Sequence, residues 1–304
     1  MTTPAPDRFV LMQTFIRIVE AGSLSAAAAR LGTTQPTISR RLQTLERSLG
    51  LRLLQRSTHS MTPTEAGARY YEQARAFVDD WGAFESDLRG AIDEPEGLLR
   101  VVVPHAFGQQ HLLAPLANFL RRYPRVAVEW YLNDGSPRLI EHGLDCEIRV
   151  GPVLDPSLVA IRLADVPRVM VAAPALLDGR TPATPDEVAA LPWLSFATYY
   201  RNDIVLTHRQ GESRTLALRP RFYTDNVYAL RSAALQGLGV AVASGWVVEE
   251  DVARGDLVHL LPDWRAPALP VTLLYPHARF YPAKLRRFID TVRDSMREPL
   301  WPGD

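Results

Sequence analysis

Along the first fifty residues, apolar and polar side chains alternate with a helical period. A helix is predicted over Arg8–Glu20, where apolar residues recur three or four positions apart, and Gly22 is expected to end it. Ser23 can cap a second helix, Leu24–Leu31, and Gly32 supplies the turn that follows. The pattern therefore predicts short helices joined by tight turns.

The third predicted helix has two faces of opposite character. Thr34 can cap it, and Pro36 is tolerated in its first turn, where the backbone N–H has no helical acceptor. One face is an apolar stripe made of Ile38, Leu42, Leu45 and Leu49. The opposite face carries no acidic residue and consists of Pro36, Arg40, Gln43 and Arg47, with Ser39 at its flank. Two helices joined by a Gly-containing turn match the DNA-binding helix-turn-helix, although a surface helix of an ordinary α domain would show the same two faces.

A helix-turn-helix places the N-terminal part of its second helix in the major groove of DNA. Arg40 could then offer two parallel N–H groups to guanine, and Gln35 could pair with adenine. Arg47 lies farther along the helix, where a phosphate contact or a solvated charge is expected.

The charge distribution supports this interpretation. The whole chain has 34 basic (Lys and Arg) and 34 acidic residues, but the segment up to Thr62 has eight arginines and three acids, a net charge of +5. The remainder is therefore net acidic. A basic segment joined to an acidic body is typical of a DNA-reading head on a sensor domain, and a chance cluster of solvated charges is the alternative.

A single long helix is predicted from Thr64 to about Ile92, a stretch without proline. Along it, apolar residues recur alternately four and three positions apart, which is a heptad pattern. They are Tyr70, Ala74, Phe77, Trp81, Phe84, Leu88 and Ala91. Because so aromatic a seam is costly to expose, we expect it to pair with a second copy of the chain. Packing against the C-terminal part of the same chain is the alternative.

Beyond a polar, hinge-like stretch at 93–97, predicted strands and helices alternate. Strands are predicted at Leu98–Val103, Val126–Leu132, Asp145–Val150, Val240–Ser244 and Val271–Tyr275. Helices are predicted at Gln109–Arg122, Pro137–His142 and Pro282–Met296, and further helices open at Thr184 and at Thr224–Asn226. This alternation predicts an α/β body, with a mostly parallel sheet and helices on both faces.

Several classes of protein find no support in the sequence. Cys146 is the only cysteine, so no intrachain disulfide can form, which fits a cytoplasmic protein. No apolar run approaches the roughly 20 residues that span a membrane, and the short polar start is not a secretory signal. The histidines show no metal-ligand spacing, and we expect neither a metal nor a cofactor.

An enzyme is the rival class. Cys146, His105 and Asp134 could be imagined as a nucleophile, a base and an orienting group. No catalytic signature surrounds the cysteine, however, and it falls inside a predicted strand, so we expect no catalytic residues and no enzyme activity. A thiol redox sensor and a ligand-free architectural DNA-binding protein are further alternatives.

Two N-terminal segments resemble the signature of the LysR-type transcriptional regulators. They are FIRIVEAGSLSAAA at 15–28 and TQPTISRRLQTLE at 34–46. The following LLQR at 53–56 and MTPTEAG at 61–67 resemble the family's wing and the start of its next helix. Leu54 stands where the family usually has phenylalanine and Met61 where it usually has leucine, and both keep an apolar packing residue.

The resemblance implies DNA-binding and dimerisation residues. The DNA-contacting positions would be Gln35, Pro36, Thr37, Ser39, Arg40 and Gln43, with Arg56 of the wing beside the minor groove. In the family the long helix is the dimerisation element, which implies an interface of Tyr70, Phe77, Trp81, Phe84 and Leu88. A dimer carries two reading heads, so the preferred double-stranded DNA site would be an interrupted palindrome.

The body also resembles the LysR-type effector domain. The similar passages are LRV at 99–101, FG at 107–108, FLRRYP at 119–124, GLDCEIRVG at 143–151, DN at 225–226 and GLGVA at 237–241. The implied fold is α/β with an all-α N-terminal part. It has a winged helix-turn-helix over 1–63, a linker helix and hinge over 64–96, and a two-lobed, periplasmic-binding-protein-like effector domain over 97–304. Lobe I would hold 97–162 and 268–304, and lobe II 163–267.

That topology places a small-molecule effector between the lobes, at the carboxyl ends of strands. The candidate lining is His105, Ala106, Phe107, Asn133, Asp134, Arg149, Phe196, Thr198 and Asn226. Three have ordinary alternatives, because His105 could be a loop histidine, Arg149 could pair with Glu147, and Asn226 could be a helix cap. Glu147 also stands where the family usually has a small apolar residue.

The family's known effectors suggest an organic acid or an aromatic metabolite. The other expected partners are RNA polymerase and further copies of this chain, in a dimer or a tetramer. Activation and repression of the regulated genes both stay open.

Overall fold

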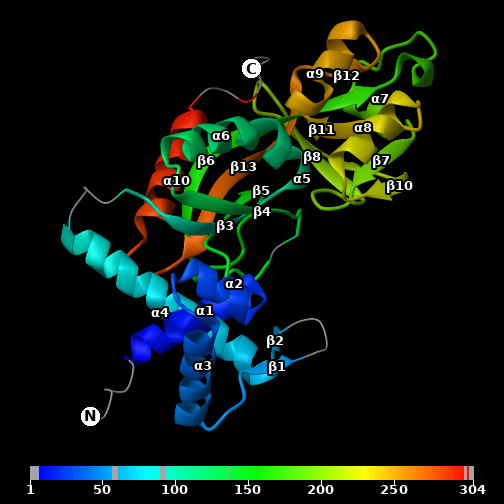
Figure 1. Cartoon of the computed structure of the whole chain (residues 1–304). Helices are drawn as coiled ribbons and strands as arrows, with labels where there is room; N and C mark the ends of the chain where they lie inside the picture. The colour runs from blue at the N-terminus through cyan, green and yellow to red at the C-terminus, as the bar shows by residue number, and fades with distance from the viewer. Residues whose placement is uncertain (1–6, 57–60, 90–93, 136, 298–299, 301–304) are drawn as a thin grey trace, which may run out of the picture. The chain divides into compact units, whose positions relative to one another are not determined.

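The computed structural model describes residues 7–56, 61–89, 94–135, 137–297 and 300 (Figure 1). The chain forms two compact units. One holds residues 1–96 with the segments 138–143 and 278–286, and the other holds 97–137, 144–277 and 287–304. Within the described ranges no single helix has the length and apolar character needed to span a membrane, although α1 and α2, bent by 118° between them, meet those criteria when taken together.

The first unit begins with the three predicted helices, α1 (Arg8–Ala21), α2 (Leu24–Arg30) and α3 (Gln35–Leu49). Gly22 ends α1 in the left-handed region at φ 68°, and the Ser23 hydroxyl caps α2 by accepting from the Ala26 N–H. The prediction for Thr34 needs a correction. It occupies the N-cap position of α3, but its hydroxyl pairs with the Thr37 hydroxyl at 2.9 Å and makes no hydrogen bond to the helix backbone.

The apolar stripe of α3 forms the centre of this unit. Ile38 and Leu45 are fully buried, in one cluster with Phe15 of α1 and Ala27 of α2. Burying this stripe turns the opposite, polar face of α3 outward, because the two faces lie half a helical turn apart.

The wing is a two-stranded antiparallel ribbon, β1 (Leu54–Arg56) and β2 (Met61–Pro63). The Glu46 carboxylate near the end of α3 accepts from the N–H groups of Leu53 and Leu54, at 2.8 and 3.2 Å. This carboxylate therefore fixes the start of the wing relative to α3. The tip of the wing, 57–60, lies outside the described residues.

The long helix, α4 (Glu65–Arg89), changes its surroundings along its length. Near its start the Tyr70 ring packs edge-on against Phe15 of α1, with 5.5 Å between ring centroids. Two turns later Phe77 and Trp81 expose 54% and 45% of their surface. The predicted end near Ile92 lies outside the described residues.

The second unit is built on a sheet with the strand order β11-β6-β13-β5-β3-β4. In lobe I, β3 (Gly97–Val103) pairs parallel with β4 (Val126–Leu132) and with β5 (Cys146–Val150). Two long strands, β6 (Leu158–Ala172) and β13 (Trp264–Pro276), run antiparallel to each other, and β13 is antiparallel to β5. The prediction of a mostly parallel sheet was therefore wrong, because these long strands add antiparallel pairs on both sides.

Lobe II is assembled around the far ends of the long strands. Its strands are β7 (Trp193–Phe196), β8 (Asp203–His208), β9 (Ser213–Ala217), β10 (Pro220–Thr224), β11 (Ala241–Ser244) and β12 (Val258–Leu260). Its helices are the 3-10 turn η2 (Pro174–Leu176), α7 (Pro185–Ala189), α8 (Val227–Leu235) and α9 (Gly245–Arg254). The strands β11 and β12 both pair antiparallel with β6, and β7 pairs parallel with β10.

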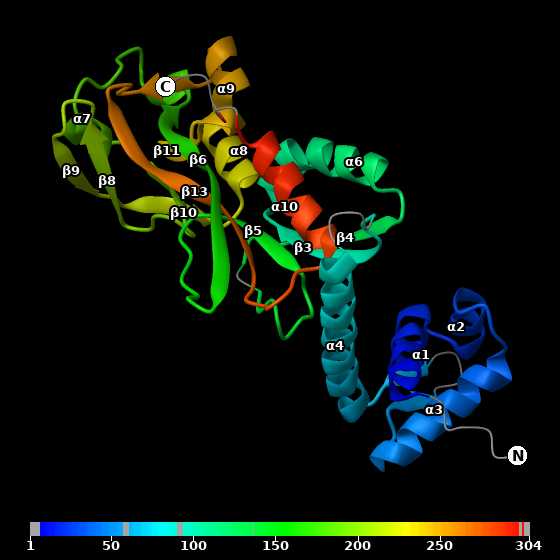
Figure 2. The same cartoon turned by 90° about the vertical axis from the view of Figure 1, so that its left-hand side faces the viewer.

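Two helices cover lobe I, α6 (Leu113–Arg122) and α10 (Ala283–Ser295), and they lie side by side (Figure 2). The rings of Phe119 and Phe288 join them at 5.4 Å. The predicted helix from Gln109 begins earlier, with α5 (His105–Phe107) and a π-helical turn, η1 (Gly108–Leu112), before α6.

The prediction of a short helix over Pro137–His142 was wrong. The chain forms turns there, with a single helical hydrogen bond from the His142 N–H to the Arg138 carbonyl. Gly143, at φ 58°, then stops the turn from propagating.

The first turn of α4 passes so close to the wing that only glycine fits at position 67. A Cβ atom on Gly67 would lie 1.9 Å from the carbonyl oxygen of Leu53, a backbone atom that cannot move aside. We predict that Gly67→Ala lowers the free energy of unfolding of the first unit by about 2 kcal/mol or more.

The same helix offers a matched control. Gly82 is exposed, and a Cβ atom added there would meet no other atom within 4 Å, so Gly82→Ala should raise stability by about 0.5–1 kcal/mol. Urea unfolding of both variants measures the difference. Equal stability of the two variants would contradict the close approach.

Candidate functional site

The outward face of α3 is the first candidate site. Gln35, Pro36, Arg40 and Gln43 are exposed, and Thr37 and Ser39 are half-buried beside them. All six predicted contact positions of this helix are therefore at least partly accessible to solvent. Arg56 lies in β1, and its side chain is outside what the structure describes.

The arginines of α3 differ in what they contact. Arg41 donates to the Thr14 hydroxyl at 3.4 Å, and Arg47 donates to the Gln43 carbonyl and the Thr44 hydroxyl of its own helix. Within the described part of the chain, no acceptor holds the Arg40 guanidinium. Arg40 is thus free to make a bidentate contact with an external acceptor.

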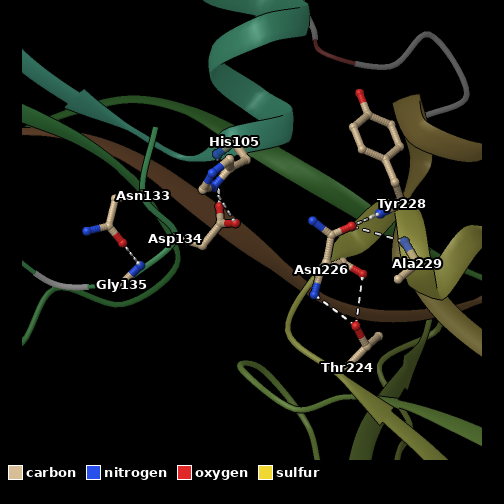
Figure 3. A network of polar contacts seen from close by, with 8 residues as sticks. All are labelled: His105, Asn133, Asp134, Gly135, Thr224, Asn226, Tyr228 and Ala229. Carbon is tan, nitrogen blue, oxygen red and sulfur yellow. Dashed lines mark hydrogen bonds and ion pairs between the residues drawn. The ribbon is translucent and has the colours of Figure 1, made fainter. Parts of the chain in front are cut away.

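The second candidate site begins where β3 and β4 end in lobe I. Asp134 accepts from the His105 backbone N–H at 3.0 Å, and its other oxygen lies 3.1 Å from His105 Nδ1 (Figure 3). Asn133 uses its side-chain oxygen locally, to accept from the Gly135 N–H at 2.8 Å. The ends of these parallel strands do bring the predicted polar groups together.

At the end of β5, Arg149 is paired with Glu147 by two hydrogen bonds, of 2.7 and 3.0 Å. Glu147 is 2% exposed, and burial raises the pKa of its carboxyl while the adjacent Arg149 lowers it. The ion pair that the sequence left as an alternative is therefore formed. A guanidinium has five N–H groups, so this pair leaves donors for a further acceptor.

Lobe II contributes Asn226, which caps α8. Its side-chain oxygen accepts from the N–H groups of Tyr228 and Ala229, both at 3.0 Å, while Thr224 accepts from the Asn226 N–H (Figure 3). The alternative of a helix cap is thus observed, and the side-chain amide N–H groups are not used by this cap.

The remaining predicted lining residues divide by burial. Ala106, Phe107 and Phe196 are buried, and Ala106 belongs to the same apolar cluster as the core of lobe II. Thr198 is exposed and lines a cavity of about 410 Å³ in lobe II. Burial of the apolar residues gives them a packing role that does not require a ligand.

Tyr199 bridges the lobes, a contact that the sequence pattern did not predict. Its hydroxyl donates to the Val150 carbonyl at 2.9 Å, and a Cβ atom on Gly151 would lie 2.7 Å from its ring. Burial, with the charge of Asp134 adding to it, raises the pKa of Tyr199 to about 12, so the hydroxyl stays protonated and keeps donating. The only sequence signal for this contact is the glycine that follows β5.

A second contact between the lobes also went unpredicted. The rings of His111 and Trp246 meet edge-on at 4.7 Å, and Phe107 lies 6.4 Å from the same indole. His111 Nε2 and Trp246 Nε1 are both buried without a hydrogen-bond partner in the described chain. Burial lowers the pKa of His111, which favours its neutral form here.

Comparison with known proteins matches both units of the chain. A family model described as the LysR substrate binding domain covers residues 93–297, and a model of the bacterial regulatory helix-turn-helix protein, lysR family, covers residues 9–68.

Individual relatives match over nearly their full lengths. The HTH-type transcriptional regulator PtxR of Pseudomonas aeruginosa is 34% identical over 288 residues, which are 94% of this chain and 92% of PtxR. The HTH-type transcriptional activator AaeR of Escherichia coli is 33% identical over 95% of this chain and 94% of AaeR. The structure of CrgA, a LysR-type transcriptional regulator from Neisseria meningitidis, is similar with a TM-score of 0.58 at 29% identity, covering 98% of this chain and all of that chain.

Proposed function

The chain belongs to the LysR family of bacterial transcriptional regulators, and on that premise we propose that α3 reads DNA under the control of a small organic acid or aromatic metabolite bound between the lobes. The observation that carries the proposal is the outward face of α3. It is polar, free of acids, and includes an arginine without an acceptor among the described residues. Like its relatives, the protein is a regulator and not an enzyme.

The geometry of α3 supports a division of labour in DNA recognition. Arg40 lies in the N-terminal half of the helix, where a recognition helix meets base edges, and suits a guanine. Gln35 at the first turn suits an adenine, and Arg56 of the wing suits the minor groove. Arg47, held by its own helix, suits a phosphate.

The exposed part of α4 supports self-association. Phe77 and Trp81 are large apolar side chains on a surface that a monomer would leave in water. Tyr70 is committed to packing on Phe15, Phe84 contacts Phe280 at 5.5 Å between ring centroids, and the Leu88 side chain lies outside what the structure describes. We therefore centre the proposed interface on Phe77 and Trp81.

Two reading heads in one dimer would favour an interrupted palindrome as the DNA site. Regulation of transcription would then require the bound protein to help or hinder RNA polymerase, and contact with the polymerase is part of this proposal.

We propose that the effector binds between the lobes, held by charge-favouring groups from both. Arg149 supplies donors from lobe I, and the N-terminus of α8 at Asn226 supplies a positive dipole end from lobe II. A carboxylate that bridged them would favour closure of the lobes, because a ligand shifts an equilibrium only through its greater affinity for one state.

Arg40 provides the first test of the DNA-binding proposal. Arg40→Ala should weaken binding to a preferred site by about 1–3 kcal/mol and relax the base preference at the contacted position. The measurement is fluorescence anisotropy at fixed salt, with a site selected by the wild type from random duplexes. Arg47→Ala is the matched control and should weaken binding to all duplexes by the same factor. If Arg40→Ala keeps both affinity and preference, α3 is not the reading helix.

The seam on α4 provides the second test. The double variant Phe77→Glu with Trp81→Glu should be monomeric by light scattering and lose tight binding to the palindrome, because two charges would be buried in the interface. Ala76→Glu adds one charge on an exposed position away from the seam of the same helix and should leave the oligomer intact. A double variant that keeps the wild-type mass would place the interface elsewhere.

The effector proposal needs variants that keep the local structure. Asn226→Asp retains a good helix cap but adds a negative charge that repels an anion. Arg149→Ala combined with Glu147→Gln removes the donor without leaving a buried, unpaired carboxylate, and Glu147→Gln alone is its control.

Organic acids that raise the thermal stability of the wild type should lose this effect in both sets of variants, while affinity for DNA stays within a few-fold. Thermal-shift and anisotropy titrations measure the two properties. Hits that act equally on every variant would exclude the proposed lining.

A further inference from the structure

Among the described residues, a buried arginine in lobe II has no anionic partner. Arg168 lies on β6 and is 7% exposed. Its Nε donates to the Pro267 carbonyl at 2.7 Å, and its Nη1 is buried without any hydrogen-bond partner in the described chain. A buried charge without compensation is costly, because the protein interior replaces little of the solvation that the charge loses.

Two carboxylates on the neighbouring chain segments are engaged by other arginines. Asp165, three residues earlier on β6, pairs with Arg162 at 2.5 Å, and Asp263 pairs with Arg209 at 3.2 Å. Burial lowers the pKa of the Arg168 guanidinium. The groups that oppose this shift are Tyr200 and Tyr199 rather than a carboxylate. A guanidinium nevertheless stays protonated at neutral pH, so the positive charge is present.

A cavity of suitable size is lined in part by Arg168. It measures about 420 Å³, within the usual range for small-molecule sites. Its apolar wall includes Val169, Pro262, Trp264 and Ala266, and Arg265 adds a second cation at the rim. The Trp264 ring packs against the His208 ring, with 5.1 Å between ring centroids. Asp165, which is paired with Arg162, also lines the cavity, as do Thr207 and His259. The cavity therefore combines a buried cation with an aromatic and aliphatic wall and a few polar groups.

We propose that this cavity is a second ligand site, which takes a small aromatic carboxylate. The carboxylate accepts from the free N–H groups of Arg168, and the ring packs against Trp264 and Val169. None of the predicted effector residues lines this cavity, including His105, Asn133, Arg149 and Asn226. The site is therefore separate from the one proposed between the lobes.

The position of Arg168 gives the site a route to the lobes. Arg168 pairs with Ser244 of β11 on one side and with Ala266 of β13 on the other. The register between β6 and β13 is irregular from Ala266 to Leu269, where Pro267 accepts from Arg168. A ligand bound here would act on the strands that connect lobe I with lobe II.

The experiment is calorimetric titration of the full-length protein with phenylacetate, and with neutral phenylacetamide as the matched control ligand. We expect phenylacetate to bind and phenylacetamide to bind at least about tenfold more weakly, since the amide lacks the charge that Arg168 compensates. Arg168→Met should weaken the binding of phenylacetate by a similar factor. It should not lower the melting temperature of the ligand-free protein, because it replaces an unpaired buried charge with an apolar side chain.

Two further variants locate the ligand. Ala268→Trp fills the cavity from its exposed rim and should abolish binding even if Arg168→Met fails to fold. Arg201→Gln changes an exposed residue of the neighbouring 410 Å³ cavity, which shares Arg168 and Pro267, and should leave binding unchanged.

The proposal is overturned if phenylacetate does not bind at millimolar concentration, or if Ala268→Trp binds it as the wild type does. It is equally overturned if binding is lost in Arg201→Gln, which would place the ligand in the other cavity. Loss of binding in Asn226→Asp with none in Ala268→Trp would place phenylacetate between the lobes, against this proposal but in favour of the effector site proposed above.

Discussion

The antiparallel pairing of β6 with β13 is the constraint on which the second unit depends. Their ladder runs from Leu158 opposite Pro276 in lobe I to Arg168 opposite Ala266 in lobe II. Because each strand belongs to the sheet of both lobes, the lobes share a continuous backbone connection. They cannot separate without breaking this ladder. The contacts of Tyr199 with Val150 and of His111 with Trp246 add side-chain links between the lobes.

Local patterns in the sequence were enough to predict the helices of the first unit, because helical periodicity and caps involve residues only a few positions apart. The long strands were harder. Only Val271–Tyr275 of β13 was predicted, and β6 was missed, since its first half mixes apolar residues with Arg162 and Asp165. Strand pairing across a hundred residues is decided by the whole fold, so the mixed character of the sheet could not be derived from the composition of single segments.

The candidate effector site shows the same limit at the level of side chains. Topology correctly brought His105 together with Asp134, because parallel strands end at the same edge of a sheet. It could not decide the partners of Arg149 and Asn226, which the structure gives to Glu147 and to the backbone of α8. Tyr199 was not predicted to bridge the lobes, because that contact depends on the space left by Gly151 in the other lobe.

The buried carboxylates Asp251 and Glu147 both have cationic partners. Asp251 is fully buried and accepts from both Arg231 and Arg254, and Glu147 has Arg149. Among the described residues, Arg168 differs from them in having only a backbone carbonyl as its hydrogen-bond partner.

The contrast with Arg40 is instructive, because that arginine also lacks an acceptor in the described chain but is exposed. Water solvates Arg40 at little cost until another acceptor displaces it. Arg168 has lost most of that water in the folded state, so an anion that reaches it recovers free energy that burial has already cost. The proposed DNA-reading helix and the proposed buried ligand site thus both use an arginine, which is exposed to water in the first and buried in the second.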